Sequence, residues 1–206
     1  MLTKEYEILK PFVDKPWLRF TLSQIKQCSK KKSKGYVYGA LQKFVKEKIL
    51  AEEKAGNVTL YTLNHNDLRA QVYAGFVGEH IAWHKKHLPF PDLQRIALRI
   101  PTDFFIFLVT GSYANNTQKK GSDIDVVVIC DDSLEPKKIY AELKHECEMN
   151  IPPIHLYVFR KSEFLEMLLS NKPNYGKEAA INNVLLYGGQ EYFKIMSEVV
   201  KNGFNG

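Results

Sequence analysis

Two short apolar runs, separated by a polar loop, stand out in the middle of the chain. The first covers residues 104–109 (FFIFLV) and the second residues 124–129 (IDVVVI). Runs of this length, rich in β-branched and aromatic residues, predict buried strands. A third run at residues 154–159 (IHLYVF) predicts another strand. These segments indicate a sheet in the second half of the chain.

Helical spacing of apolar residues dominates the segments around these strands. Asn66 is the expected N-cap of a long helix that ends near Pro89, and a shorter helix is predicted over residues 93–100. Further helices are predicted at residues 136–148, 163–169, 178–187 and 191–200. The pattern is typical of a mixed sheet flanked by helices.

The first 64 residues show a different order of elements. Apolar residues from Leu2 to Val13 predict a helix, residues 17–20 a short apolar connector, and residues 22–28 a second helix. A third helix is predicted from Ser33 to Lys48. Two alternating runs, at residues 49–52 and 58–63, are joined around Gly56 and predict a β-hairpin.

Basic residues are concentrated in this N-terminal segment. Residues 1–64 contain 13 Lys/Arg and 6 Asp/Glu, a balance of +7. Because the whole chain has 29 and 23, residues 65–206 hold 16 and 17, a balance of −1. The asymmetry points to an anionic partner of the N-terminal segment, most simply nucleic acid.

The candidate chemistry lies at the ends of the first two strands. Asp123 and Asp125 are two residues apart, so on a strand both carboxylates would project from one face. Adjacent like charges favour a bound cation, and Mg²⁺ takes carboxylate and phosphate oxygens as ligands. Gly111 and Ser112 follow the first strand, where glycine permits a close backbone approach and serine adds a hydroxyl to a phosphate site. These residues are the parts of a phosphoryl-transfer site.

The pattern Gly111-Ser112, ten residues, Asp123-x-Asp125 resembles the signature of the nucleotidyltransferase superfamily, the one that includes DNA polymerase beta, and most of all its minimal prokaryotic members. The resemblance implies transfer of a nucleoside monophosphate from a nucleoside triphosphate (NTP) to an acceptor hydroxyl. Gly111 and Ser112 would hold the triphosphate, and Asp123 and Asp125 would bind one or two Mg²⁺ ions. Lys119 and Lys120 would add positive charge in the loop, or would only make it soluble.

A third carboxylate is implied by the same resemblance on a later strand, and here the chain departs from the pattern. The strand predicted at residues 154–159 has His155 at that place and Tyr157 on the same face. A histidine can act as a general base but adds no negative charge for a second Mg²⁺. The alternative is a transcription regulator whose degenerate nucleotidyltransferase domain senses a nucleotide.

The N-terminal order, three helices and a hairpin, resembles the winged helix-turn-helix of prokaryotic transcription regulators. The resemblance makes residues 33–48 the recognition helix and implies DNA binding, and such regulators commonly dimerise. Lys34, Tyr36 and Tyr38 would face the major groove, and Lys30, Lys31 and Lys32 would contact phosphates. A solvated basic turn is the alternative for the lysines.

The expected architecture is therefore α/β (α+β) in two domains. A winged helix-turn-helix is expected at residues 1–64, a connecting helix at 65–89, and a nucleotidyltransferase-like mixed sheet flanked by helices at 90–206. The acceptor is expected to be a protein or a nucleic acid.

Other sequence features limit the location of the protein and further sites. The apolar runs are too short and too charged for a membrane span, and the N-terminus has no apolar signal core, so we expect a cytoplasmic protein. Cys28, Cys130 and Cys147 match neither a disulfide framework nor a zinc spacing. His80, His84 and His87 share one helical face, with the spacing of a zinc site or simply of a polar helix surface.

Overall fold

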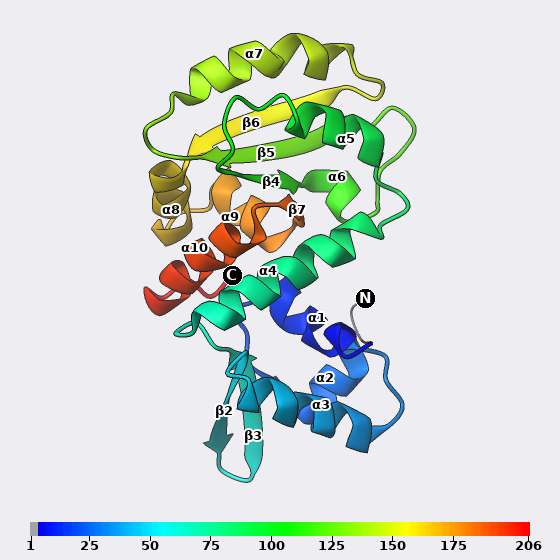
Figure 1. Cartoon of the computed structure of the whole chain (residues 1–206), viewed down its shortest axis with the longest axis vertical. Coiled ribbons are helices and arrows are strands. Elements are labelled where there is room, and N and C mark those ends of the chain that lie inside the picture. Colours follow the sequence, from blue (N-terminus) through cyan, green and yellow to red (C-terminus); the bar gives the residue numbers. More distant parts are fainter. Residues whose placement is uncertain (1–3) are drawn as a thin grey trace. The chain divides into compact units, whose positions relative to one another are not determined.

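The computed structural model describes residues 4–206, so the expected contribution of Leu2 to the first helix lies outside the described residues. The described chain is a mixed α/β structure with two sheets, as the sequence predicts (Figure 1). Its elements are α1 (Tyr6–Asp14), β1 (Phe20–Thr21), α2 (Leu22–Cys28), α3 (Lys34–Lys46), β2 (Leu50–Ala55), β3 (Val58–Leu63), α4 (Leu68–Trp83), α5 (Phe90–Ala97), β4 (Phe105–Val109), α6 (Gly111–Ala114), β5 (Ile124–Cys130), α7 (Pro136–Met149), β6 (Ile154–Arg160), α8 (Lys161–Leu169), α9 (Tyr175–Ile181), β7 (Val184–Tyr187) and α10 (Gly189–Lys201).

Backbone contacts divide the chain into two units. The first runs up to Gly78 and also contains Gly189–Gly206, and the second is Glu79–Gly188. The boundaries expected from the sequence were 64 and 90, whereas this division falls within α4 and groups α10 with the N-terminal unit. Gly75 of α4 and Gly189 of α10 approach so closely that a Cβ on Gly75 would lie 2.4 Å from the carbonyl carbon of Gly189.

In the first unit, α1, α2 and α3 pack around one apolar core. Ile8, Phe12, Ile25, Val37 and Leu41 are all fully buried there. The predicted hairpin is present as β2 and β3, which pair antiparallel. The segment expected to be only a connector contributes β1, whose two residues pair with β3 and complete a sheet of order β1-β3-β2.

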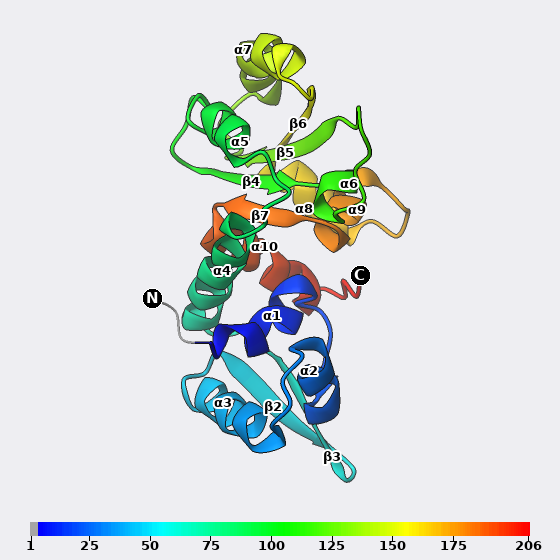
Figure 2. The same ribbon diagram turned by 90° about the vertical axis from the view of Figure 1, so that its right-hand side faces the viewer.

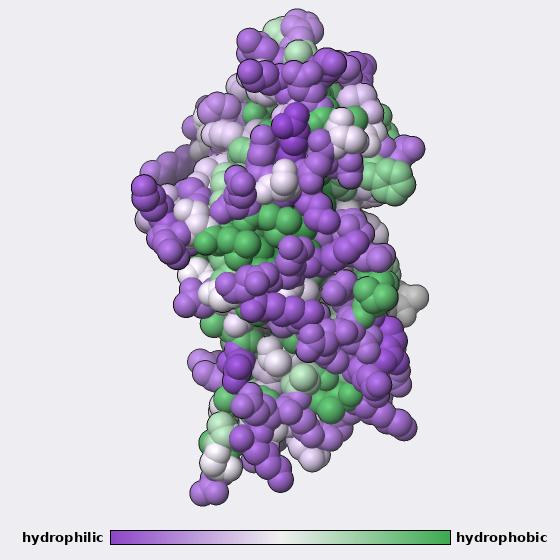
Figure 3. Space-filling model, turned by 90° about the vertical axis from the view of Figure 1, so that its left-hand side faces the viewer, coloured by the Kyte–Doolittle hydropathy of each residue, from purple (hydrophilic) through white to green (hydrophobic). Residues whose placement is uncertain are grey.

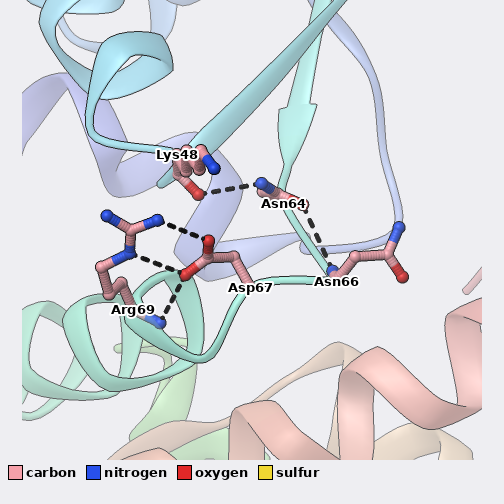
Figure 4. A network of polar contacts seen from close by, with 5 residues as sticks. All are labelled: Lys48, Asn64, Asn66, Asp67 and Arg69. Atoms are coloured by element: carbon pink, nitrogen blue, oxygen red, sulfur yellow. Dashed lines mark hydrogen bonds and ion pairs between the residues drawn. The ribbon is translucent and has the colours of Figure 1, made fainter.

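A polar network begins α4 (Figure 4). Asp67, not Asn66 as predicted, caps this helix, since its Oδ1 accepts the N–H of Arg69 at 2.9 Å. Two further bonds from the Arg69 guanidinium reach the same carboxylate, and these bonds lower the pKa of Asp67 to about 2. Asn64 donates to the carbonyl of Lys48 at 3.0 Å and accepts from the N–H of Asn66. Asn66 thus belongs to the turn before the helix.

The second unit is built on a four-stranded sheet of order β6-β5-β4-β7. β5 pairs antiparallel with β4 and parallel with β6, and the predicted strands are all present. One face packs on α5 and α7 through Leu93, Ile96, Ile139 and Leu143, and α8 packs on the other face of β5 and β6 (Figures 1 and 2).

The helix predicted over residues 178–187 is wrong in its second half. α9 ends at Ile181, and Val184–Tyr187 form β7, which pairs antiparallel with β4. The side-chain amide of Asn183 donates to the carbonyls of Ala179 and Ala180 at 2.8 and 2.9 Å, which satisfies the last turn of the helix and ends it. A four-residue apolar run carries no periodicity that separates strand from helix.

Most of the face shown in Figure 3 is hydrophilic, and apolar side chains gather there in separate patches. None of the helices in residues 4–206 combines the length and apolar character needed to cross a membrane.

Candidate active site

The turn after β4 brings the backbone of Gly111 against Asp125. Gly111 has φ +62°, a left-handed backbone conformation that residues other than glycine rarely adopt. A Cβ at this position would lie 2.2 Å from Oδ2 of Asp125. The N–H of Thr110 donates to the Asp125 carbonyl at 2.9 Å, which holds the end of β4 beside the start of β5. The glycine therefore meets both a conformational and a steric requirement.

The two carboxylates lie at the start of β5, one in the strand and one just before it. Asp125 is the second residue of the strand, whereas Asp123 precedes the strand, which begins at Ile124. Burial raises the pKa of the Asp125 carboxyl above its ordinary value; His155 partly offsets this, while the charges of Asp123 and Glu178 raise the pKa further. A cation beside Asp125 would therefore stabilise the charged form of this carboxyl.

His155 is the register partner of Asp125 on the parallel strand β6. Its Nδ1 lies 3.7 Å from Oδ1 of Asp125, and its side chain is 67% exposed. The imidazole is therefore beside the carboxylates, beyond direct hydrogen-bond distance, and open to solvent. It also lines a cavity of about 270 Å³, together with Asp123 and with Lys144 and Glu148 of α7.

An aromatic wall next to Asp125 was not predicted. Tyr175, the first residue of α9, bonds through its hydroxyl to Oγ1 of Thr110 at 3.0 Å. Its ring lies 4.3 Å from that of Tyr157, between ring centroids, and burial raises the pKa of Tyr175 to about 12. Tyr157 was expected on the same strand face as His155, whereas Tyr175 follows a loop with no periodicity that could have linked it to the site. Thr110 precedes Gly111 directly, so this wall supports the turn.

The remaining predicted nucleotide-binding residues surround the same turn. Ser112 is the second residue of α6, a single helical turn whose first N–H groups have no partner within the helix. Lys119 and Lys120 are exposed in the loop between α6 and β5 and form no ion pair with any residue in 4–206. Their side chains add positive charge to this loop.

Within residues 4–206, no three His, Cys, Asp or Glu side chains gather into a cluster that could hold a metal ion. The zinc interpretation of His80, His84 and His87 gains no support, since His87 bonds instead to the carbonyl of Tyr113 at 2.9 Å. Two carboxylates, with Gly111 packed against one of them, fit a hard ion such as Mg²⁺ only if phosphate oxygens complete the ligand set.

The predicted DNA-contacting residues lie before and on α3. Tyr36 and Tyr38 are 41% and 50% exposed. Lys31 is bonded to Glu7, which raises the pKa of its ammonium. Lys30, Lys32 and Lys34 are exposed and form no ion pair in the described chain. Three of the four lysines thus carry unpaired charge.

Comparison with known proteins adds one family match. Residues 103–181, which include the turn, both carboxylates, His155 and Tyr175, match the family model described as "Nucleotidyltransferase domain". No curated protein matches the chain. Among solved structures, a crystal structure of a toxin–antitoxin with AMP-PNP is 15% identical, over 56% of this chain and 88% of that one. Its TM-score of 0.38 is too low to support a statement about fold. Residues 103–181 are therefore similar to a nucleotidyltransferase domain.

Proposed function

We propose that this protein is a Mg²⁺-dependent nucleotidyltransferase that moves a nucleoside monophosphate from an NTP to an acceptor hydroxyl, with diphosphate leaving. The observation that carries the proposal is the approach of Gly111 to Asp125. Gly111 has a left-handed backbone conformation, and there is no room for a side chain between it and the half-buried carboxylate of Asp125. A phosphate-binding backbone and a cation-binding carboxylate thus share one end of the sheet.

The roles follow from the chemistry of each group. The backbone at Gly111 and the hydroxyl of Ser112 would hold the triphosphate, with Lys119 and Lys120 adding positive charge. Asp123 and Asp125 would bind Mg²⁺, which when bound neutralises charge on the transferring phosphates. The exposed imidazole of His155 would take the proton from the acceptor hydroxyl, a role open to histidine near neutral pH.

We also propose that the first 64 residues bind DNA as a winged helix-turn-helix. Three helices precede the β2–β3 hairpin, and α3 begins with exposed Lys34, Tyr36 and Tyr38. Lys30 and Lys32 would contact phosphates, whereas the bond from Lys31 to Glu7 gives that lysine a role within the fold. A homodimer would present two such helices, and a protein or a nucleic acid would serve as acceptor.

One observation favours a second candidate function. β6 carries His155 where the resemblance implies a third carboxylate, so the site lacks a charge that would help to hold a second Mg²⁺. The alternative is a DNA-binding regulator in which this domain binds a nucleotide without turning it over. Nucleotide would then change the affinity for DNA.

Diphosphate release separates the two functions. The purified protein is mixed with Mg²⁺ and each of the four ribonucleoside triphosphates, with and without cell extract as a source of acceptor. The Asp123→Ala/Asp125→Ala variant is measured in parallel. Release by the native protein but not by the variant supports the enzyme, and equal release in both contradicts it. Nucleotide binding without release, together with a nucleotide-dependent shift in DNA affinity, supports the regulator.

A further inference from the structure

A second cavity lies at the opposite end of β4 from the candidate active site. It has a volume of about 610 Å³, within the range of about 300–1,000 Å³ that small-molecule sites occupy. Phe105, the first residue of β4, lines it, whereas Gly111 follows the end of that strand. Since a five-residue strand spans roughly 17 Å, the two sites are separate. We call it the distal cavity.

In residues 4–206, five aromatic side chains line the distal cavity. Trp83, Phe90, Phe105, Phe107 and Tyr187 all line the distal cavity, and they come from α4, α5, β4 and β7. The ring of Phe105 stacks on that of Tyr187 with centroids 4.6 Å apart. Trp83 is held by a bond from its Nε1 to the carbonyl of Leu186 at 3.4 Å. The wall is therefore partly preorganised.

The charge of the lining indicates which kind of ligand the distal cavity would take. Asp103 is the one charged residue among the described residues that line the distal cavity, and it forms no ion pair within residues 4–206. The two arginines of the neighbouring α5 segment are engaged elsewhere, Arg95 with Asn150 and Arg99 with Glu146. No protein cation neutralises this carboxylate from the lining, although aromatic faces and a carboxylate both attract positive charge.

We propose that the distal cavity binds a small organic cation, an aromatic or alicyclic amine whose apolar body contacts the rings and whose ammonium faces Asp103. An apolar cavity with a single directing charge gives both affinity and a choice of ligand sign. The site does not depend on the proposed transfer reaction, since none of the residues assigned to that reaction lines it.

Three matched naphthalene probes test the proposal by isothermal titration of the full chain: 1-naphthylmethylammonium, naphthalene-1-methanol and 1-naphthoate. The cation should bind about tenfold more tightly than the alcohol, and the carboxylate most weakly. Asp103→Asn should remove the preference between cation and alcohol and leave the affinity for the alcohol unchanged. Ala97→Trp, which fills the distal cavity, should abolish binding of all three probes.

Asp92→Asn is the matched control, because it removes a carboxylate from α5 that does not line the distal cavity. It should retain the full preference for the cation. Failure of all probes to bind, equal affinities for cation and alcohol, or a preference that survives in Asp103→Asn would each overturn the proposal. Asp103 is exposed, so this variant is expected to fold even if Ala97→Trp does not.

Discussion

Gly111 combines a left-handed backbone conformation with a close approach to the Asp125 carboxylate. Gly111→Ala introduces a Cβ into a left-handed turn and places it 2.2 Å from the Asp125 carboxylate, so the turn or the carboxylate must move. A displacement of about 1 Å in a site can lower the rate of a catalysed reaction on the order of 100-fold. We expect the affinity for Mg²⁺–NTP to fall by a similar factor. Equilibrium titration with NTP checks it.

Gly56→Ala is the control for Gly111→Ala, because it introduces the same backbone strain without the steric clash. Gly56 has nearly the same φ, +60°, yet a Cβ there meets nothing within 4 Å. It should lower the free energy of unfolding by about 1 kcal/mol and leave nucleotide affinity unchanged. If both variants bind nucleotide like the native protein, Gly111 has no part in the site.

Asp125 is a carboxyl group whose charged form is disfavoured by the fold. Its folded-state pKa is raised above the ordinary 3.8, so the fold favours its neutral form. The stability from this group is present below the unfolded pKa and is lost as the pH rises through the raised folded pKa. We therefore expect Asp125→Asn to increase the melting temperature at pH 7, with the difference vanishing near pH 3.

Asp131→Asn is the opposite case, because the Asp131 carboxylate accepts the N–H of Ser133 at 2.9 Å and that bond lowers its pKa. It should not increase the melting temperature at pH 7. Thermal unfolding of the three proteins between pH 3 and pH 8 checks both expectations. A lower melting temperature for Asp125→Asn at pH 7 would contradict the account of Asp125.

Elements with a strong pattern were predictable, and those set by tertiary contacts were not. Buried apolar runs predicted β4, β5 and β6, and helical spacing together with Pro136 predicted α7. β1 is two residues long and exists because Phe20 and Thr21 meet β3. β7 was predicted as a helix since its strand character comes from pairing with β4, far away in sequence. Tyr175 was missed because its place beside the site comes from a bond to Thr110, which is also far away in sequence.

The proposed contact of Lys30, Lys32 and Lys34 with DNA can be tested by removing their charges. The triple variant Lys30→Gln/Lys32→Gln/Lys34→Gln removes three unpaired charges and should weaken DNA binding on every sequence tested. The slope of log affinity against log salt should fall by about 2 to 3 units. Lys137→Gln/Lys138→Gln/Lys172→Gln, in the other unit, is the charge-matched control. An unchanged slope in the first variant would mean that these lysines are only a solvated turn.

The whole chain combines two units with different chemistry. The positive charge is concentrated in residues 1–64, whereas residues 103–181 carry the family match and the candidate site. Sequence spacing indicated the candidate site, because glycine, serine and two aspartates near strand ends need few long-range contacts to be interpreted. The packing of α10 with the N-terminal unit had no such local signal, because an amphipathic helix does not specify its partner.

Binding of Mg²⁺–NTP is the claim that both candidate functions share. Isothermal titration of the native protein and of Asp123→Asn/Asp125→Asn with each NTP, with and without Mg²⁺, tests it most directly. We predict binding by the native protein that requires Mg²⁺ and weakens at least about tenfold in the variant. No binding of any NTP, or equal binding by the two proteins, would contradict the assignment of this site.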